Sequence, residues 1–102
     1  MIRVVAVLTA KPGRREEFLT LFKANVPAVL KEDGCREYTP VIDAEGAGPH
    51  QTKFGPDSFV VMETWENLAA LEAHRTAPHM LAFAKAAKDL IADRKIYVLS
   101  QA

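Results

Sequence analysis

The chain has a single cysteine and no excess of charge of either sign. Of its 102 residues, 13 are Lys or Arg and 13 are Asp or Glu, so the formal net charge is zero. Proteins that bind phosphate backbones need clustered Lys and Arg, so this composition argues against a nucleic-acid partner. Cys35 cannot form a disulfide within the chain, which is typical of proteins that work in the reducing cytoplasm.

The sequence also lacks any long hydrophobic run. Apolar stretches such as Val4 to Leu8 fall far short of the roughly 20 residues that a membrane-spanning helix requires. The N-terminus superficially resembles a signal peptide, but it is short and rich in β-branched valine, so a first strand is the better interpretation. With no internal repeat and no linker, residues 1–102 are expected to form one cytoplasmic domain without a membrane partner.

Four stretches have the composition of β-strands, because β-branched and aromatic residues cluster or alternate in them. In the second of them, Cys35 to Ile42, strict alternation puts Cys35 and Tyr38 on opposite faces of the strand. Pro40 cannot donate to a strand ladder, so it indicates an edge, a bulge or a strand end. The predicted strands are Ile2 to Thr9, Cys35 to Ile42, Phe59 to Trp65 and Lys95 to Ser100.

Three stretches carry apolar residues at helical spacing. Thr76 is a good cap for the last of these helices, and Pro78 is tolerated in the first turn of that helix. Pro27 removes one amide donor from the first, which predicts a kink or a break near Val26. The predicted helices are Arg14 to Lys31, a short helix that Asn67 caps and that ends near His74, and Pro78 to about Ile91.

The resulting order, β-α-β-β-α-α-β, predicts an α+β, ferredoxin-like domain with an antiparallel sheet and helices on one face. Residues 44–57, rich in Gly and Pro, are predicted to be a long mobile loop or a hairpin tip, and we expect a lid or a cross-dimer arm there. Several strands also carry apolar residues for a second face, and a second copy of the same sheet is the simplest cover for it. We therefore expect a homodimer through the sheet faces. The residues assigned to that face are Val5 and Val7, Val60 and Met62, and Ile96 and Val98.

The stretch 59–80 holds most of the residues that could carry chemistry. Glu63 and Trp65 share one face of a strand, and the following short helix brings His74 towards its end. A hydrophobic core alone would not require a carboxylate on so apolar a strand. This stretch is therefore where a functional site is expected.

Several short motifs spread along the chain give a family resemblance. They are Lys11-Pro12-Gly13, Gly34-Cys35, Glu63-Thr64-Trp65-Glu66, Leu71-Glu72-Ala73-His74, and Ala77-Pro78-His79-Met80 with Phe83. With these motifs the chain resembles the antibiotic biosynthesis monooxygenase family, and within it the cofactor-independent quinol monooxygenase branch. The resemblance covers nearly the whole chain except the loop 44–57.

The resemblance implies a dimeric α/β barrel with a pocket for flat aromatic molecules between the sheet and helices of each protomer. Enzymes of this branch oxidise dihydroxyaromatics with O₂ and need no metal or flavin. Trp65 stands where the family has a pocket-lining Trp. The related haem-degrading branch adds an Asn on the first strand and a His in the last helix. This chain has neither, since residues 82–88 contain no His, so haem degradation is disfavoured.

Each candidate residue has a functional and a structural interpretation. Glu63 is a general base, its pKa raised if it faces an apolar pocket, or a structural carboxylate held by hydrogen bonds. His74, with an unperturbed pKa of ~6.5, is a proton acceptor or a cap on a helix end. Trp65 stacks on a substrate or fills the core.

Phe83 and Tyr38 either border the pocket or pack in the core. His79 lies five residues from His74, which is not the spacing of a helical metal site, so no metal is expected and His79 is assigned to substrate binding. Cys35 is expected to be an inert thiol. The leading hypothesis is a monooxygenase that acts on a quinol-like or polyphenolic substrate with O₂, and the alternative is a non-catalytic barrel, such as a stress-response protein, that binds an aromatic ligand.

Overall fold

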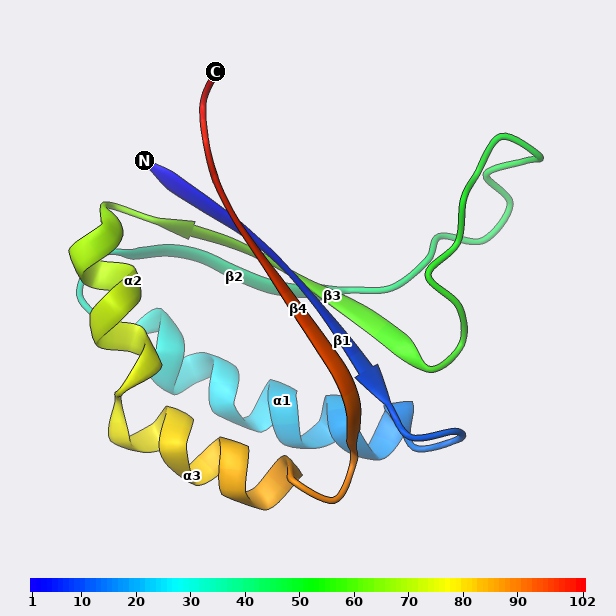
Figure 1. Cartoon of the computed structure of the whole chain (residues 1–102), viewed down its shortest axis with the longest axis horizontal. Helices are drawn as coiled ribbons and strands as arrows, with labels where there is room; N and C mark the ends of the chain where they lie inside the picture. The colour runs from blue at the N-terminus through cyan, green and yellow to red at the C-terminus, as the bar shows by residue number, and fades with distance from the viewer.

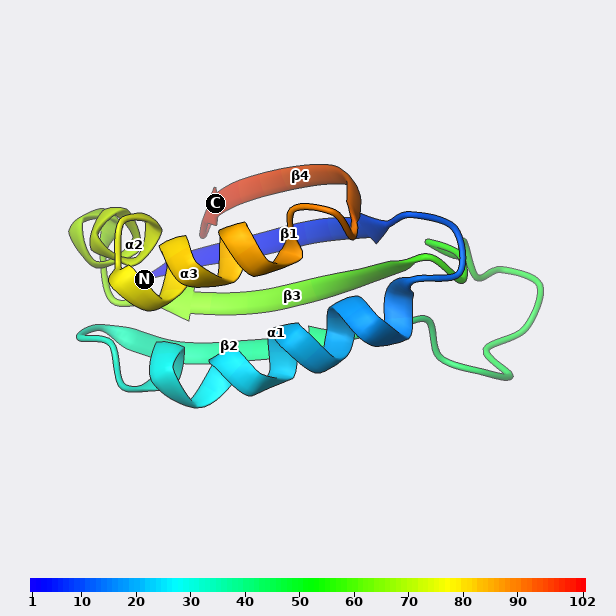
Figure 2. The same ribbon diagram turned by 90° about the horizontal axis from the view of Figure 1, so that it is seen from below.

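Four antiparallel strands form a sheet and three helices cover one of its faces in the computed structural model, which describes residues 1–102 (Figure 1). The strand order is β2-β3-β1-β4, and Figure 2 shows α1 and α3 in front of the strands. The predicted α+β fold with an antiparallel sheet is confirmed. The elements are β1 (Ile2–Ala10), α1 (Arg15–Leu30), β2 (Cys35–Val41), β3 (Ser58–Trp65), α2 (Leu68–Arg75), α3 (Pro78–Ala87) and β4 (Ile91–Ser100).

The sequence predicted a kink or a break near Val26. Helix α1 is continuous through Pro27, so there is no break. The proline lies in the last turn, where it removes only the amide that would bond the carbonyl of Lys23. The helix buries Phe18, Phe22 and Val29, and the last of these lies in the same turn as Pro27.

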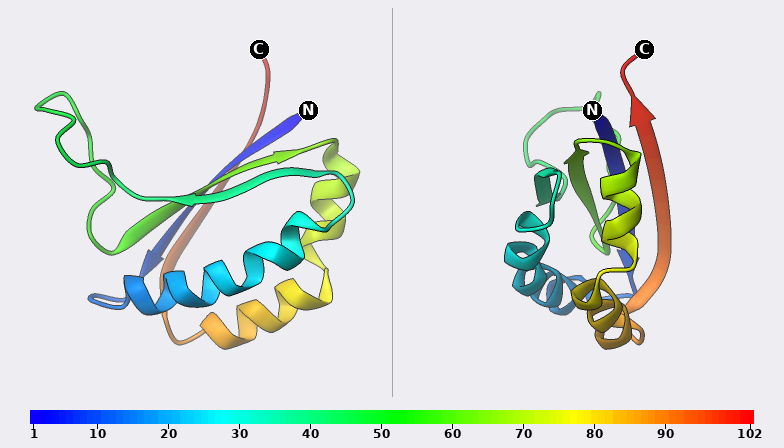
Figure 3. Two further views of the ribbon diagram at one scale, coloured as in Figure 1. Left: turned by 180° about the vertical axis from the view of Figure 1, so that it is seen from behind. Right: turned by 90° about the vertical axis from the view of Figure 1, so that its left-hand side faces the viewer.

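Helix α2 begins as predicted, because the Asn67 side chain accepts a hydrogen bond of 2.9 Å from the amide of Ala70. Thr76, however, ends α2 and does not start α3, whose N-cap is Ala77 with Pro78 in the first turn. The two helices are therefore separated by a very short turn (Figure 3).

The boundary between α3 and β4 was also misplaced by sequence periodicity. The helix ends at Ala87, and the strand begins at Ile91 and not at Lys95. Ile91 is apolar and fits a helical stripe, but it pairs with Ala10 across the sheet. Strand pairing with β1 thus extends β4 into residues whose local pattern is helical.

Strand β2 contains a bulge at Arg36. Cys35 pairs with Trp65, and Glu37 pairs with Thr64, the neighbour of Trp65 on β3. Strand β2 therefore holds one extra residue between these two pairs. As a result Cys35 and Tyr38 lie on the same, helix-covered face, and the strict alternation expected from sequence was wrong here. Pro40 lies on β2, which is an edge strand, and an edge is one of the three positions predicted for it.

The face of the sheet away from the helices carries a group of exposed apolar side chains, Met62, Tyr97 and Leu99. The register places Met62 and Tyr97 on either side of Val5, and Leu99 lies farther along the same face of β4. Ile96 and Val98 lie opposite Ala6 and Val4, so they belong to the helix side, contrary to the sequence-based assignment. The expected homodimer remains a prediction.

The loop after β2 projects from the domain as an irregular segment (Figure 1). Its base is closed by Asp43, whose carboxylate accepts hydrogen bonds from the amides of Phe54 and Gly55 at 3.0 and 2.9 Å. None of the helices is both long and apolar enough to cross a membrane.

Candidate functional site

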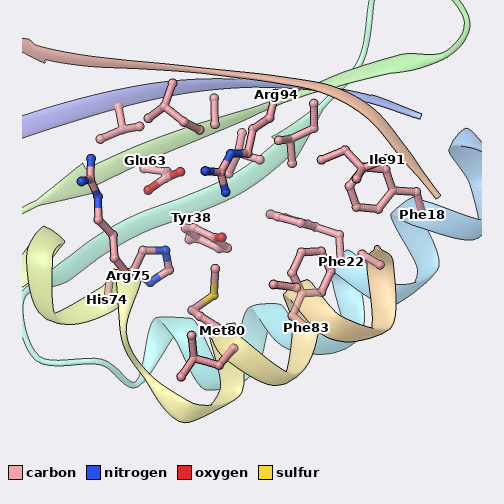
Figure 4. Close-up of a pocket in the computed structure, with 18 of the residues that line it drawn as sticks. Phe18, Phe22, Tyr38, Glu63, His74, Arg75, Met80, Phe83, Ile91 and Arg94 are labelled. Atoms are coloured by element: carbon pink, nitrogen blue, oxygen red, sulfur yellow. The ribbon is translucent and has the colours of Figure 1, made fainter. Parts of the chain in front are cut away.

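A cavity of about 840 Å³ lies between the sheet and the helices (Figure 4). Fifteen of its twenty lining residues are hydrophobic, and they come from β1, α1, β3, α2, α3 and β4 as well as from Tyr38 of β2. The volume is within the usual range for small-molecule sites. The lining residues that are not hydrophobic are Glu63, His74, Arg75, Lys88 and Arg94.

Glu63 enters the cavity from β3, because residues of alternate parity on this strand face the helices. Its Oε1 accepts a hydrogen bond of 2.9 Å from Nε1 of Trp65. Its other oxygen has no protein partner, yet no buried side-chain polar atom is left unsatisfied, so that oxygen faces the cavity. Burial raises the pKa of Glu63, while the Trp65 hydrogen bond and the nearby His74 oppose the rise and Glu32 adds to it.

Trp65 is fully buried and is not part of the cavity wall. Its indole packs against the imidazole of His74, with ring centroids 4.6 Å apart. The cavity wall therefore does not include the Trp65 ring, which the resemblance expected to line the pocket. Trp65 instead contacts two of the polar residues that line the cavity, Glu63 and His74.

His74 is held by a carboxylate that the sequence reasoning missed. Nδ1 of His74 lies 2.8 Å from Oε2 of Glu32, and Nε2 of His79 lies 2.7 Å from the same oxygen. A carboxylate only accepts hydrogen bonds, so Nδ1 of His74 carries the proton. Nε2 of His74 makes no hydrogen bond to protein and is not buried without a partner, so its lone pair is accessible from the cavity.

The position of Glu32 depends on the turn that follows α1. Gly34 in that turn has φ +84°, and a Cβ added there would come within 2.7 Å of the Ala70 Cβ on α2. Glycine thus allows the turn to pack closely on α2, the helix that carries His74. The turn signal at Gly34 was visible in the sequence, but the 42-residue separation of Glu32 from His74 hid their contact.

Aromatic rings form one wall of the cavity. Tyr38 stacks on Phe22 with ring centroids 5.3 Å apart, and Phe83 meets Phe22 edge-on at 5.8 Å. The Tyr38 ring also lies 5.4 Å from the ring of His74. Burial, with smaller effects of Glu63 and Glu32, raises the pKa of Tyr38, so its hydroxyl stays neutral and can donate a hydrogen bond.

Four of the six residues expected at the site line the cavity together, namely Glu63, His74, Tyr38 and Phe83. Trp65 and His79 do not line it. Trp65 contacts Glu63 and His74 of the wall, and His79 bonds Glu32, which lies outside the wall. His74 does not cap its helix through its ring, since the ring bonds Glu32. No group of three or more His, Cys, Asp or Glu side chains is placed to hold a metal ion.

Three cationic residues of the cavity wall were also missed. Arg75 ends α2, Lys88 follows α3, and Arg94 lies on the helix side of β4 opposite Leu8. The last two lie around the boundary between α3 and β4 that sequence periodicity misplaced. Their common position around one cavity is a property of the tertiary fold.

Comparison with known proteins identifies clear relatives. Residues 1–86 match the family model described as "Antibiotic biosynthesis monooxygenase". The probable quinol monooxygenase YgiN of Escherichia coli K12 is 41% identical over 97% of this chain and 96% of its own length. The crystal structure of PA3566 from Pseudomonas aeruginosa superposes with a TM-score of 0.81 at 28% identity, covering 99% of this chain and 93% of that one. Rv0793 from Mycobacterium tuberculosis gives a TM-score of 0.79 at 25% identity, covering 99% and 94%.

Proposed function

The chain belongs to the antibiotic biosynthesis monooxygenase family, and we propose that it oxidises a quinol-like aromatic substrate with O₂ and without a bound cofactor. The observation that carries this proposal is the pairing of an aromatic-walled cavity with two proton acceptors, Glu63 and Nε2 of His74. The relative YgiN, named a probable quinol monooxygenase, supports the same reaction class.

The first step of the proposed reaction is loss of a phenolic proton to Nε2 of His74. Because Glu32 holds the proton on Nδ1, the imidazolium that forms lies next to a carboxylate and is stabilised by it. The free oxygen of Glu63 accepts a hydrogen bond from the second hydroxyl and so orients the ring. Phe22, Phe83 and Tyr38 pack on the ring and exclude water.

The substrate supplies all the electrons. Its phenolate passes one electron to O₂, and the semiquinone and superoxide combine at a ring carbon that bears hydrogen. The peroxide that forms takes the proton back from His74 and becomes a hydroperoxide. Loss of that hydrogen as a proton, with cleavage of the O–O bond, leaves a new carbonyl and releases hydroxide, which is protonated to water. The balance is hydroquinone plus O₂ to hydroxyquinone plus water.

In this proposal Trp65 is a positioning residue. Its indole N–H holds one oxygen of Glu63, and its ring supports the imidazole of His74. His79 acts one step farther away, because it shares the Glu32 oxygen that holds His74. Neither side chain needs to touch the substrate.

We also propose that the protein works in the cytoplasm as a homodimer joined through the outer faces of its sheets. The exposed apolar side chains of that face, Met62, Tyr97 and Leu99, support the dimer, because a patch of this kind on a sheet is usually covered. The lone cysteine supports a reducing compartment.

The proposal is tested by oxygen consumption with metal-stripped protein and a panel of benzo- and naphthohydroquinones. We expect uptake above autoxidation that saturates with substrate and that falls roughly a hundredfold in His74→Ala. His50→Gln, which changes an exposed histidine of the loop, is the matched control and should leave uptake unchanged. Saturable binding across the panel with no enzyme-dependent uptake would instead establish the non-catalytic binding protein.

A further inference from the structure

The cavity concentrates positive charge in a protein whose overall charge is zero. Its wall contains three cationic side chains, Arg75, Lys88 and Arg94, and one carboxylate, Glu63. The three cations come from the end of α2, the turn after α3 and the strand β4. The excess of positive charge in the cavity wall is therefore created by the fold and not by one basic run of sequence.

These cations are not neutralised by the protein. Arg94 and Lys88 take part in no ion pair, whereas Arg14 and Arg36 elsewhere on the surface have carboxylate partners at 2.8 and 3.0 Å. Arg75 has only a loose contact of 3.7 Å with Glu72, and both of those side chains are more than half exposed.

The three cations also do not neutralise the carboxylate of Glu63. None lies within ion-pair distance of its carboxylate, whose hydrogen-bond partner is Trp65. Figure 4 shows the guanidinium group of Arg94 extending from β4 into the cavity and that of Arg75 directed to the part of the cavity that holds Glu63. Cations without close carboxylate partners on the wall of a mainly apolar cavity attract an anionic ligand.

We propose that Arg94 is the centre of an anion subsite and that the natural substrate is a dihydroxyaromatic compound carrying a carboxylate. This inference rests on the proposed quinol oxidation. Arg94 binds the carboxylate through its planar guanidinium, and Arg75 and Lys88 add to the attractive potential. The hydroxyl groups then lie at Glu63 and His74, with the ring against the aromatic wall. A neutral quinol fills the same cavity but leaves the subsite empty.

The test compares two ligands that differ only in the charged group, 1,4-dihydroxy-2-naphthoate and 1,4-dihydroxynaphthalene. Binding is measured by calorimetry without oxygen, so the readout does not depend on turnover. We expect the carboxylate to bind about tenfold more tightly at low salt, with the difference shrinking as salt is added. Arg94→Gln should remove most of this preference, because it weakens binding of the carboxylate far more than binding of the neutral quinol.

Two further variants make the result specific. Arg94→Lys keeps the charge but not the planar fork and should retain part of the preference, while Lys53→Gln, in the exposed loop and outside the cavity, should retain all of it. The 2-sulfonate of the same quinol, added as a third ligand, tells whether the site requires a carboxylate or accepts any anion. Equal affinity for the neutral and carboxylated quinols, or an equal loss for both in Arg94→Gln, would overturn the subsite.

Oxygen uptake with the same ligands separates this inference from the proposed function. Uptake with both quinols but no preference for the acid would refute the subsite and leave the monooxygenase standing. A preference that depends on Arg94, with no uptake from any ligand, would refute the monooxygenase and establish a site that binds aromatic acids.

Discussion

Glu32 holds the imidazole of His74 through a 2.8 Å contact between its Oε2 and Nδ1, although 42 positions separate the two residues. The same oxygen accepts from His79, so one carboxylate connects two histidines. The contact leaves Nε2 of His74 as the side of the ring that a ligand in the cavity can reach. A proton acceptor is thereby oriented by a residue outside the cavity wall.

Replacing Glu32 by Gln should lower turnover by roughly ten- to a hundredfold while changing KM little. The amide removes the negative charge that stabilises the imidazolium, but the cavity wall and its aromatic contacts stay in place. Steady-state oxygen consumption measures the effect, and Glu45→Gln in the exposed loop is the control. A rise in KM of the same size, with kcat unchanged, would show that Glu32 acts on ligand binding and not on proton transfer.

The buried carboxyl of Glu63 should make the stability of the protein depend on pH. Its pKa is raised above the ordinary value of 4.5, mainly by burial, with Trp65 and His74 opposing and Glu32 adding to the rise. The folded state therefore binds more protons than the unfolded state as pH rises above that value, so the contribution of Glu63 to stability falls with rising pH.

This dependence can be measured by urea unfolding of wild type and Glu63→Gln at about pH 5 and about pH 8. Gln keeps an acceptor for the Trp65 indole and never ionises, so the variant should gain stability relative to wild type at the higher pH. A stability difference that does not change between the two pH values would contradict the raised pKa.

Trp65→Phe should separate the positioning role of the indole from its bulk. The ring still fills much of the core, but Glu63 loses its hydrogen-bond donor, at a cost of about 1–3 kcal/mol in unfolding free energy. Oxygen uptake should fall by more than the fraction unfolded can explain, because Glu63 is no longer held. Circular dichroism and uptake measured on the same samples decide this, and full activity in a folded variant would remove Trp65 from the mechanism.

A charge on the outer face of the sheet should dissociate the proposed dimer. Met62→Glu places a carboxylate among the apolar side chains that neighbour Val5, where a second sheet would bury it. Light scattering after size exclusion should show twice the mass of the chain for wild type and one chain mass for the variant. Leu68→Glu, on the exposed side of α2, should remain dimeric. A monomeric wild type would refute the dimer.

The sequence by itself determined the elements and the residues that could carry chemistry. Alternation on β3 placed Glu63 and Trp65 on one face, and apolar spacing with caps and breakers located the helices, because these signals are local and act within a few residues. The errors arise where a local signal permits two structures. Pro27 is tolerated in a last turn, and Ile91 fits a helical stripe but pairs with a neighbouring strand.

Only the tertiary structure decided which residues meet. The bulge at Arg36 turned Tyr38 and Cys35 to one face, the turn at Gly34 brought Glu32 against His74, and strand register aimed Arg94 into the cavity. Each depends on contacts between segments far apart in the chain, which no local pattern encodes. Sequence thus selected the candidate acid–base residues, whereas folding determined which of them face a ligand and which support them from behind.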